Sequence, residues 1–309
     1  MAADPALEEF EAHRARLFGI AYRMLGSAAD ADDVLQDAWL RWQAVDRSAV
    51  QAPAAFLART VTNLCLTALT SARARREVYV GPRLPEPVLT GPAGTDLGPL
   101  DHAEQRDSVS FALLTVLERL SPPERAAYVL REAFAYSAAE VAELIGTSEA
   151  NVRQLHARAR RRVSGAGAGA APREADPARL RELVETFLDA SRGGDLAALE
   201  ALLSEDVVAR ADGGGVVSAG RRPVEGREKV ARYVTGVVDR FAAGLQRVLV
   251  EVNGVPAAAF TDGTSLRAVL VVQTRDGRVS ALDLVLNPDK LAHAERQLSR
   301  IGALPGREG

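Results

Sequence analysis

The sequence predicts a multidomain protein in which two all-α domains are followed by an α+β domain. Helical hydrophobic spacing dominates up to about residue 163 and is interrupted once by a stretch rich in proline and glycine. Beyond residue 177 two helical patterns give way to three β-rich runs separated by turn dipeptides. At 309 residues the chain is long enough for two or three domains, each with its own core.

The first helical domain is expected over residues 1–77. Apolar residues recur at helical spacing between Phe10 and Met24, and again between Val34 and Val45. A third helix is expected to begin near Pro53, because proline is favoured in the first turn of a helix.

The second helical domain is expected over residues 103–163. The preceding stretch, 78–102, mixes five prolines with glycines and cannot continue a helix, so it is predicted to be a linker. Ser121-Pro-Pro-Glu124 then supplies a capping box with proline at the first helical position. Residues 164–176, in which Gly165, Gly167 and Gly169 lie among alanines, are predicted to form a flexible tether.

Residues 177–309 are expected to form the α+β domain. Helices followed by a sheet of hairpins, with a last helix from Pro288, are typical of that class. The expected helices cover 178–191 and 195–203, and the expected strands cover Leu245–Val252, Leu266–Gln273 and Val279–Leu286.

Composition excludes several classes of protein. No apolar run approaches the roughly 20 residues that span a bilayer, so we expect a cytoplasmic protein with no membrane partner. The single cysteine, Cys65, excludes a disulfide framework and is expected to be a buried thiol. The four histidines have no metal-binding spacing, so neither a metal nor a cofactor is predicted. A net charge of −3 means that any DNA binding must come from local basic patches.

Residues 137–163 have the pattern of a helix-turn-helix. Ser137 and Glu140 can cap a first helix, Gly146 marks the turn, and five arginines fall between 153 and 162 on the second helix. Such a helix can lie in the major groove, although a solvated basic helix end is an alternative. The residues expected near base edges are Glu149, Ala150, Asn151, Arg153 and Gln154, and those expected on phosphates include Arg158, Arg160 and Arg161.

The helix beginning near Pro53 also has two faces. Leu57, Val61, Leu64 and Ala68 are expected on the core side. The opposite side can grip the phosphates of one strand, although a solvated face explains the same pattern. The residues expected on that side are Arg59, Asn63, Thr70 and Arg73, with Arg75 and Arg76 extending its basic end.

The helix expected from Ala31 to Val45 has an acidic outer face, which is a poor surface for DNA. An exposed leucine ringed by charge favours a protein partner, although single exposed apolar residues are common. The residues of this face are Asp33, Gln36, Asp37, Leu40 and Arg41.

These segments, in this order, resemble the extracytoplasmic-function sigma factors of the sigma-70 class. Residues Asp32-Asp33-Val34-Leu35-Gln36-Asp37-Ala38-Trp39 are similar to region 2, and Ser121 to Arg162 is similar to region 4. The resemblance implies two partners, core RNA polymerase (its β′ clamp and β subunits) and promoter DNA. The acidic face would bind the clamp, the loop 46–51 with Arg59 and Asn63 would open the −10 element, and the helix 149–162 would read the −35 element.

The rest of the chain resembles a subgroup in which a SnoaL-like cone domain follows region 4. There the fused domain is expected to do the work of a separate anti-sigma protein. Arg83 stands where tryptophan is usual in this subgroup, and Val216 stands where lysine is usual. The three motifs that carry the likeness contribute Tyr79, Gly81, Pro82, Leu84, Pro85, Glu86 and Pro87; Asp212, Gly213, Gly214 and Gly215; and Asn287, Pro288, Asp289, Lys290 and Leu291.

Each motif also has a simpler interpretation. The prolines of the first could make a stiff spacer, the glycines of the second a hairpin turn, and Asn287-Pro288 a helix N-cap. The glycine triplet does not lead from a strand into a helix, so it does not predict a phosphate-binding loop.

The sequence therefore predicts a sigma factor that directs promoter-specific initiation and is modulated in cis by its C-terminal domain. The alternative is a helix-turn-helix regulator whose C-terminal domain senses a small molecule. A third hypothesis, an enzyme, would need an acid or base in the cone, and a ligand held there without chemistry also remains an alternative. We expect no enzyme and no catalytic residues, because no histidine falls on the predicted strands; the candidate acids are Asp212, Glu251, Asp262 and Asp283.

Overall fold

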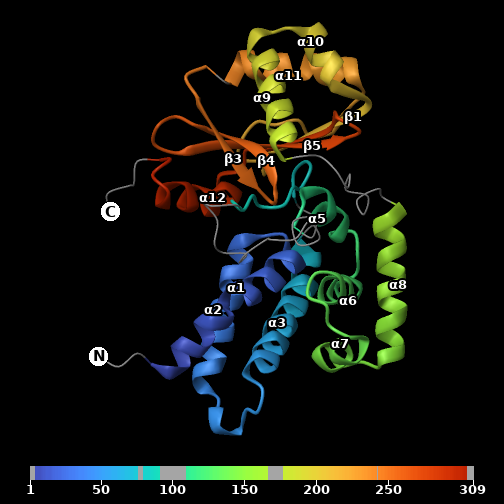
Figure 1. Cartoon of the computed structure of the whole chain (residues 1–309), viewed down its shortest axis with the longest axis vertical. Helices are drawn as coiled ribbons and strands as arrows, with labels where there is room; N and C mark the ends of the chain where they lie inside the picture. Colours follow the sequence, from blue (N-terminus) through green and yellow to red (C-terminus); the bar gives the residue numbers. More distant parts are fainter. Residues whose placement is uncertain (1–3, 76–78, 91–108, 166–176, 242, 305–309) are drawn as a thin grey trace. The chain divides into compact units, whose positions relative to one another are not determined.

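A computed structural model describes residues 4–75, 79–90, 109–165, 177–241 and 243–304 of the chain (Figure 1). They fall into two compact units. The N-terminal unit combines Met1–Val78 with Gly94–Gly169, and the C-terminal unit combines Tyr79–Ala93 with Ala170–Gly309. Residues 79–90, which lie in the stretch expected to be a linker between the helical domains, belong to the C-terminal unit.

The first part of the N-terminal unit is a helical bundle with capped ends. The Asp4 side chain accepts a hydrogen bond from the backbone N–H of Ala6, and Gly26 ends the first helix in the left-handed region, with φ of 71°. Trp42 is fully buried and its indole N–H donates to the Ala6 carbonyl at 3.1 Å. The elements are α1 (Pro5–Leu25), α2 (Ala28–Ala44), a 3-10 turn (Arg47–Ala49) and α3 (Pro53–Arg75).

The buried face of α3 differs from the predicted one. Leu57 and Val61 are buried as expected, but Leu64 and Ala68 are only half-buried. Neighbouring helices cover a stripe rotated toward Cys65, which is fully buried, and burial raises the pKa of its thiol. Among the described side chains of α3 the buried stripe is Leu57, Ala58, Val61, Thr62, Cys65 and Leu69.

The second part of the N-terminal unit carries both predicted capping boxes. Glu124 accepts a hydrogen bond from the backbone N–H of Ser121 at 3.0 Å, and Glu140 does the same for Ser137 at 2.7 Å. Helices α6 and α7 pack against α1 and α3, and the buried Arg125 donates to the Met24 carbonyl at 2.7 Å. The elements are α5 (Phe111–Leu117), α6 (Pro122–Glu132), α7 (Ala138–Ile145) and α8 (Glu149–Gly165).

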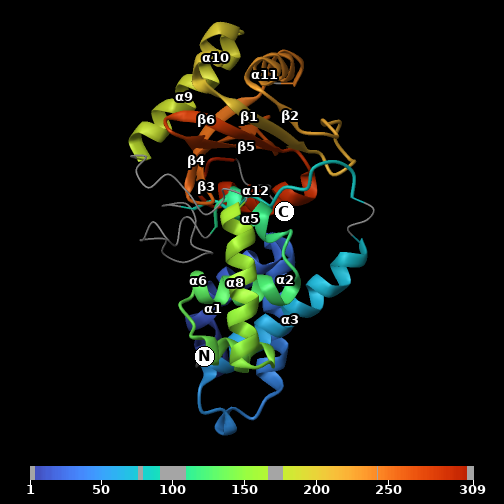
Figure 2. The same ribbon diagram turned by 90° about the vertical axis from the view of Figure 1, so that its right-hand side faces the viewer.

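The C-terminal unit is a six-stranded sheet with helices on both faces, in the strand order β2-β1-β6-β5-β4-β3. Helices α9, α10 and α11 lie on one face and α12 lies on the other (Figures 1 and 2). All neighbouring strands are antiparallel except β1 and β6. The elements are α9 (Pro177–Gly193), α10 (Leu196–Leu202), β1 (Leu203–Asp212), β2 (Val224–Glu225), α11 (Arg227–Phe241), β3 (Gln246–Val252), β4 (Val255–Thr261), β5 (Leu266–Arg275), β6 (Arg278–Val285) and α12 (Pro288–Arg300).

The predicted α+β class is confirmed, but four elements of this unit were not expected. The prediction missed β1, β2, β4 and α11, and it extended a helix to residue 203, which is the first residue of β1. Strand β4 contains Ala257, Ala258 and Ala259, and alanine is depleted in strands. The tertiary packing overrides that preference, because all three alanines are fully buried.

Candidate nucleic-acid interfaces and linker-binding site

The candidate DNA-reading helix α8 follows α7 across a left-handed glycine. Gly146 has φ of 68° and its N–H bonds to the Ala142 carbonyl, which ends α7. The Ser148 hydroxyl then accepts a hydrogen bond from the backbone N–H of Asn151 at 3.2 Å. Because one stripe of α8 is buried, its opposite side is left to solvent; the buried residues are Val152, Leu155, Ala159 and Val163.

The residues expected near base edges differ in how free they are. Gln154 is exposed, and its amide makes no hydrogen bond to the described residues. Arg153 is paired with Glu149 one turn earlier, and the Asn151 amide donates to the Thr147 hydroxyl at 2.9 Å. The amide of Gln154 therefore needs no internal bond to be broken before it reaches a base.

Acidic side chains of α6 face the later arginines of α8, a feature that the hydrophobic spacing did not indicate. The buried Glu124 lies 2.6 Å from Nη1 of Arg162 and 3.3 Å from Nε of Arg158. Glu132 lies 3.9 Å from Nε of Arg160. DNA phosphates must compete with these carboxylates for three of the arginines.

The pKa of Glu124 reflects its place in this cluster. Burial acts to raise it, but the hydrogen bonds from Ser121 and the charges of Arg162 and Arg158 outweigh burial, so the pKa lies below its ordinary value. Arg161 has no acidic partner among the residues that the structure describes, which leaves it the best placed of these side chains for a phosphate.

The second candidate interface, on α3, is exposed where it is described. Arg59, Asn63 and Thr70 lie in solvent on the side opposite the buried stripe. Arg73 and Arg75 belong to α3, but their side chains lie outside the described part of the chain, as does Arg76 altogether.

The acidic face of α2 is also free. Leu40 is the most exposed apolar side chain of this helix, with 56% of its surface in solvent. Among the described residues none of its neighbours on the face forms an ion pair or a side-chain hydrogen bond, so the face is available to a partner. The exposed residues are Asp33, Gln36, Asp37, Leu40 and Arg41.

The three short motifs meet around one buried carboxylate at the end of β1. Asp212 has none of its surface in solvent. Its Oδ1 accepts hydrogen bonds from the Tyr79 hydroxyl at 2.5 Å and the Gly214 N–H at 3.1 Å. Its Oδ2 accepts from the Leu84 N–H at 2.8 Å and from Nζ of Lys290 at 2.7 Å. Four donors, one of which is the Lys290 cation, offset the cost of burying this charge.

Lys290 contacts two residues of the linker motif, Tyr79 and Leu84. Its Nζ also donates to the Leu84 carbonyl and lies 5.0 Å from the centre of the Tyr79 ring. Burial and the bond to Asp212 raise the pKa of Tyr79, so its hydroxyl stays a neutral donor. The Arg83 guanidinium lies 5.5 Å from the centre of the same ring. We call the contacts of Tyr79, Leu84, Asp212 and Lys290 the hub.

Asn287 and the glycines of the second motif pack around the hub. Asn287 caps α12 by accepting from the Asp289 N–H at 3.1 Å, and its amide lies 3.3 Å from the Tyr79 hydroxyl. Gly214 has φ of +61°, and a Cβ there would lie 2.3 Å from the Asn287 amide nitrogen. A Cβ on Gly213 would lie 2.2 Å from the Val217 carbonyl oxygen. The glycines are therefore required by close packing as well as by the turn.

A second set of contacts, which we call the edge clasp, holds the end of the linker segment beside β3. Leu89 forms an antiparallel bridge with Val252, and its N–H donates to Oε1 of Gln297 at 2.8 Å. The Asn253 side chain accepts from the Val88 N–H at 3.0 Å, and the Thr90 hydroxyl donates to Glu251 at 2.7 Å. Residues 84–90 are all buried, which a free spacer would not be.

The sequence interpretation missed the edge clasp. Asn253-Gly254 is a turn dipeptide and Asn253 adopts a positive φ of 53°, so its position was readable from the sequence, but its bond to the linker was not. Nothing in the spacing of α12 distinguishes Gln297, because the bond joins residues 208 positions apart.

Each of the four acids considered for catalysis already has hydrogen-bond or ion-pair partners within the C-terminal unit. Asp212 belongs to the hub and Glu251 to the edge clasp. Asp283 is fully buried and paired with Arg210 at 2.6 Å, and burial raises its pKa although Arg210 and Gln273 act in the opposite direction. Asp262 accepts hydrogen bonds from Thr264, Ser265 and Arg267, which hold its pKa far below the ordinary value.

A large hollow lies on the other face of the sheet, under α9 and α11. Its volume is about 1260 Å³, and its lining is mainly apolar. Within the described parts of the chain no cluster of three or more histidine, cysteine or acidic residues is suited to a metal ion. No described helix combines the length and the apolar character needed to cross a bilayer.

Two family models match the two parts of the N-terminal unit. Residues 10–75 match the family model of sigma-70 region 2, and residues 110–163 match that of sigma-70 region 4. The chain is 42% identical over 294 residues to ECF RNA polymerase sigma factor SigJ of Mycobacterium tuberculosis, covering 92% of each chain. It is 30% identical to a probable ECF sigma factor, SigI, of the same species, covering 93% of this chain and 95% of SigI.

A solved structure extends this similarity to three dimensions. The crystal structure of the M. tuberculosis extracytoplasmic function sigma factor SigJ superposes with a TM-score of 0.74 at 38% identity. The match covers 93% of this chain and 98% of the other, so it includes both helical regions and the α+β unit.

Proposed function

Because this chain belongs to the extracytoplasmic-function sigma factors of RNA polymerase, we propose that its C-terminal unit regulates promoter recognition by holding the linker between the two promoter-binding regions. The protein directs transcription initiation. Its SnoaL-like unit is proposed to act on the same chain, in the way that a separate anti-sigma protein acts on others.

The observation that carries this proposal is the burial of residues 84–90 in the C-terminal unit. A sigma factor must place two DNA-binding regions on promoter elements at a fixed separation, and this segment lies between them. Only four peptide steps join Arg75 to Tyr79, so the chain can span at most about 14 Å there. A regulator that holds the segment more tightly in one arrangement than in another shifts their equilibrium by that difference in affinity.

The interfaces are assigned in the same proposal. The exposed face of α2 binds the β′ clamp of core polymerase, with further contact to the β subunit, and the described face of α3 holds the −10 element. On α8, Gln154 and its neighbours read the −35 element while Arg161 contacts phosphate. The protein works in the cytoplasm, where its polymerase is found.

We propose that the C-terminal unit regulates without catalysis. General acid–base chemistry needs a titratable group that is free to reach a substrate. Three of the four acids considered are committed to ion pairs or to the linker, and Asp262 is held ionised by its hydrogen bonds. A small ligand in the hollow would then act by binding alone.

Run-off transcription with purified core polymerase tests the regulatory role. Lys290→Met should break the hub, because it leaves Asp212 buried without its cation, and should change promoter-specific transcript yield. The chain has only one other lysine, the exposed Lys229, so Lys229→Met is the matched control and should behave like the unmodified protein. Unchanged transcription by a Lys290→Met protein that still binds core polymerase would refute the proposal.

A further inference from the structure

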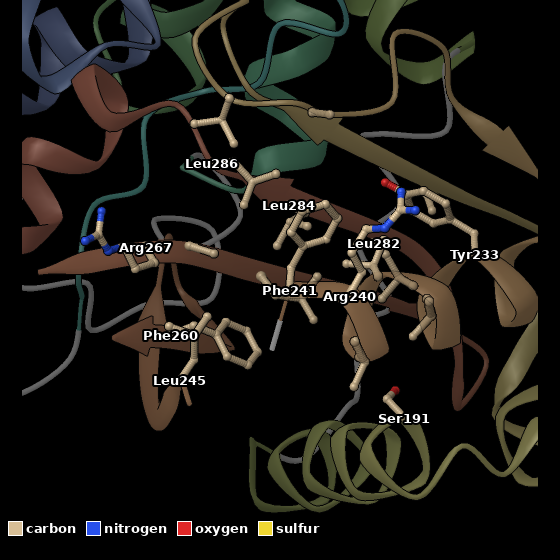
Figure 3. Close-up of a pocket in the computed structure, with 18 of the residues that line it drawn as sticks. Ser191, Tyr233, Arg240, Phe241, Leu245, Phe260, Arg267, Leu282, Leu284 and Leu286 are labelled. Carbon is tan, nitrogen blue, oxygen red and sulfur yellow. The ribbon is translucent and has the colours of Figure 1, made fainter. Parts of the chain in front are cut away.

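The side chains of the C-terminal unit leave a large hollow unfilled. It lies between α9, α11 and the sheet, with Phe260, Leu282 and Leu284 toward its floor (Figure 3). Its volume of about 1260 Å³ exceeds that of most pockets for drug-sized molecules. Leu270 and Leu284 are direct cross-strand partners, so they form a continuous apolar floor.

The two faces of the same strands differ in how completely they are covered. On the face toward α12, Val269, Val271 and Val285 have none of their surface in solvent. On the face toward the hollow, the alternating residues Leu270 and Leu284 are only half-buried. Apolar surface at the middle of a sheet that its own protein leaves uncovered would be stabilised by an apolar ligand.

The burial of helix α11 also decreases along its length. Val230 and Ala231, near its start, are fully buried, whereas Val234 and Val237 further along are half-buried. Gly236 lines the hollow, and a Cβ there would have no heavy atom within 4 Å. Glycine in a helix interior lowers stability relative to alanine, and no contact within the described chain requires it here. Glycine leaves this part of the lining without a side chain.

Polar groups at the edge of the hollow favour an anion. The Tyr233 hydroxyl makes no hydrogen bond to the described residues, and burial raises the pKa of Tyr233, so the hydroxyl is a neutral donor. The lining contains six arginines, of which Arg210, Arg232, Arg247 and Arg267 are each paired with a carboxylate. Arg240, which projects from the same helix as Tyr233 (Figure 3), has no acidic partner among the residues described.

The hollow and the hub share two segments of chain. Leu286, Pro288 and Leu291 line the hollow, while Asn287 and Lys290 between them hold the linker. The loop that follows the glycine triplet also lines it, from Val217 to Gly220. A molecule that moves these side chains therefore moves the residues that grip the linker.

We propose that the hollow binds a carboxylate with a long alkyl chain, and that this binding tunes the hub. The chain lies on Phe260, Leu270 and Leu284, and the carboxylate accepts hydrogen bonds from Tyr233 and Arg240. The binding step stands independently, whereas its effect on transcription rests on the proposed regulatory function.

Displacement of a fluorescent probe, 11-(dansylamino)undecanoic acid, from the full-length protein tests the binding step. Dodecanoate should displace the probe at one site per chain, and dodecanol should do so at least about tenfold less well because it lacks the charge. No saturable probe binding would overturn the proposal. Equal displacement by the alcohol would overturn the choice of an anion.

Two substitutions locate the probe. Gly236→Leu adds a bulky side chain to the lining of the hollow, at a position where a Cβ meets no heavy atom within 4 Å, and should weaken binding at least about tenfold. Tyr233→Phe should weaken it about threefold or more. Gly193→Leu is the control, because a Cβ on Gly193 also has no neighbour within 4 Å and Gly193 does not line the hollow. Equal binding by Gly236→Leu and the unmodified protein would overturn the assignment.

Transcription separates the two steps. With probe binding established, dodecanoate should change run-off transcript yield from the unmodified protein and leave the Gly236→Leu protein unaffected. If the ligand binds but transcription does not respond, the coupling is wrong and the binding site stands. If Lys290→Met changes transcription but no probe binds, the regulatory role stands and the ligand is wrong.

Discussion

Helix α8 and the hub use charge in opposite ways. On α8 the arginines lie in solvent. Three of them pair with carboxylates of α6, and a DNA phosphate can replace those carboxylates as the partner. In the hub a single carboxylate and a single lysine are buried and surrounded by donors. Exposed charge suits a surface that must bind and release DNA, whereas buried charge fixes one arrangement of the chain.

The largest expected effect lies in the hub. Asp212→Asn keeps the shape of the side chain but leaves Lys290 buried without its counter-ion, which should cost about 3–5 kcal/mol of the free energy of unfolding. Chemical denaturation measures the loss. Acylation of the two lysines followed by mass spectrometry should show Lys290 protected in the unmodified protein and reactive in the variant, with Lys229 as the internal reference.

A matched carboxylate keeps that test specific. Asp206 pairs with Arg275 at 2.5 Å, but both side chains are more than half exposed. Asp206→Asn should leave the stability and the Lys290 reactivity unchanged. Equal effects of the two substitutions would show that burial of the charge is not what stabilises the hub.

Close packing of the glycines gives the next effect. Gly214→Ala should cost about 2–3 kcal/mol, because it adds a clash with Asn287 to the strain of a positive φ. Gly263→Ala isolates the strain, since Gly263 also has a positive φ but its Cβ would have no neighbour within 4 Å. It should cost about 1 kcal/mol in the same denaturation experiment. Equal losses would mean that Asn287 moves aside freely.

Substitutions on α8 should change DNA binding and leave folding alone. Gln154→Ala should cost about 1–3 kcal/mol of promoter binding by the holoenzyme and relax the preference at one base pair of the −35 element. Arg161→Ala should weaken binding to all sequences alike and reduce its salt dependence. Both are measured by fluorescence anisotropy over a range of salt. A change in unfolding free energy would contradict the assignment of these exposed residues.

Substitution of Glu124 is expected to give the smallest change in stability. Glu124 is itself buried, but it pairs with exposed arginines of α8. Glu124→Gln should cost about 1 kcal/mol of stability and strengthen nonspecific DNA binding, because it frees Arg158 and Arg162. The pKa of Glu124 is lowered in the fold, so its contribution is present above the ordinary glutamate pKa of about 4.3 and is lost as the pH falls below it. Denaturation from pH 7 to pH 3 should show a shallower loss for the variant.

The same contrast explains what the sequence could predict. The capping boxes at Ser121 and Ser137 depend on residues three positions apart, so they are legible locally and the structure contains both. The exposed side of α8 follows from helical periodicity. The hub joins Tyr79 to Asp212, 133 positions away, and only the likeness to a known subgroup drew attention to its motifs.

Local sequence patterns did not predict the features that depend on contacts between distant parts of the chain. The buried alanines of β4 have no strand preference of their own, and the bonds of the edge-clasp residues Asn253 and Gln297 to the linker join positions 165 and 208 residues apart. The buried stripe of α3 was misplaced because helices from elsewhere in the chain set which side is covered.

The most direct test is to lock the linker in place and measure transcription. Cysteines at Thr90 and Glu251 can be joined by a short bismaleimide, and the native Cys65 is buried with a raised thiol pKa, so it should not compete. The account predicts that joining them changes promoter-specific run-off transcription by at least about fivefold relative to the same protein left unjoined. Equal transcript yields from the joined and unjoined proteins would contradict it.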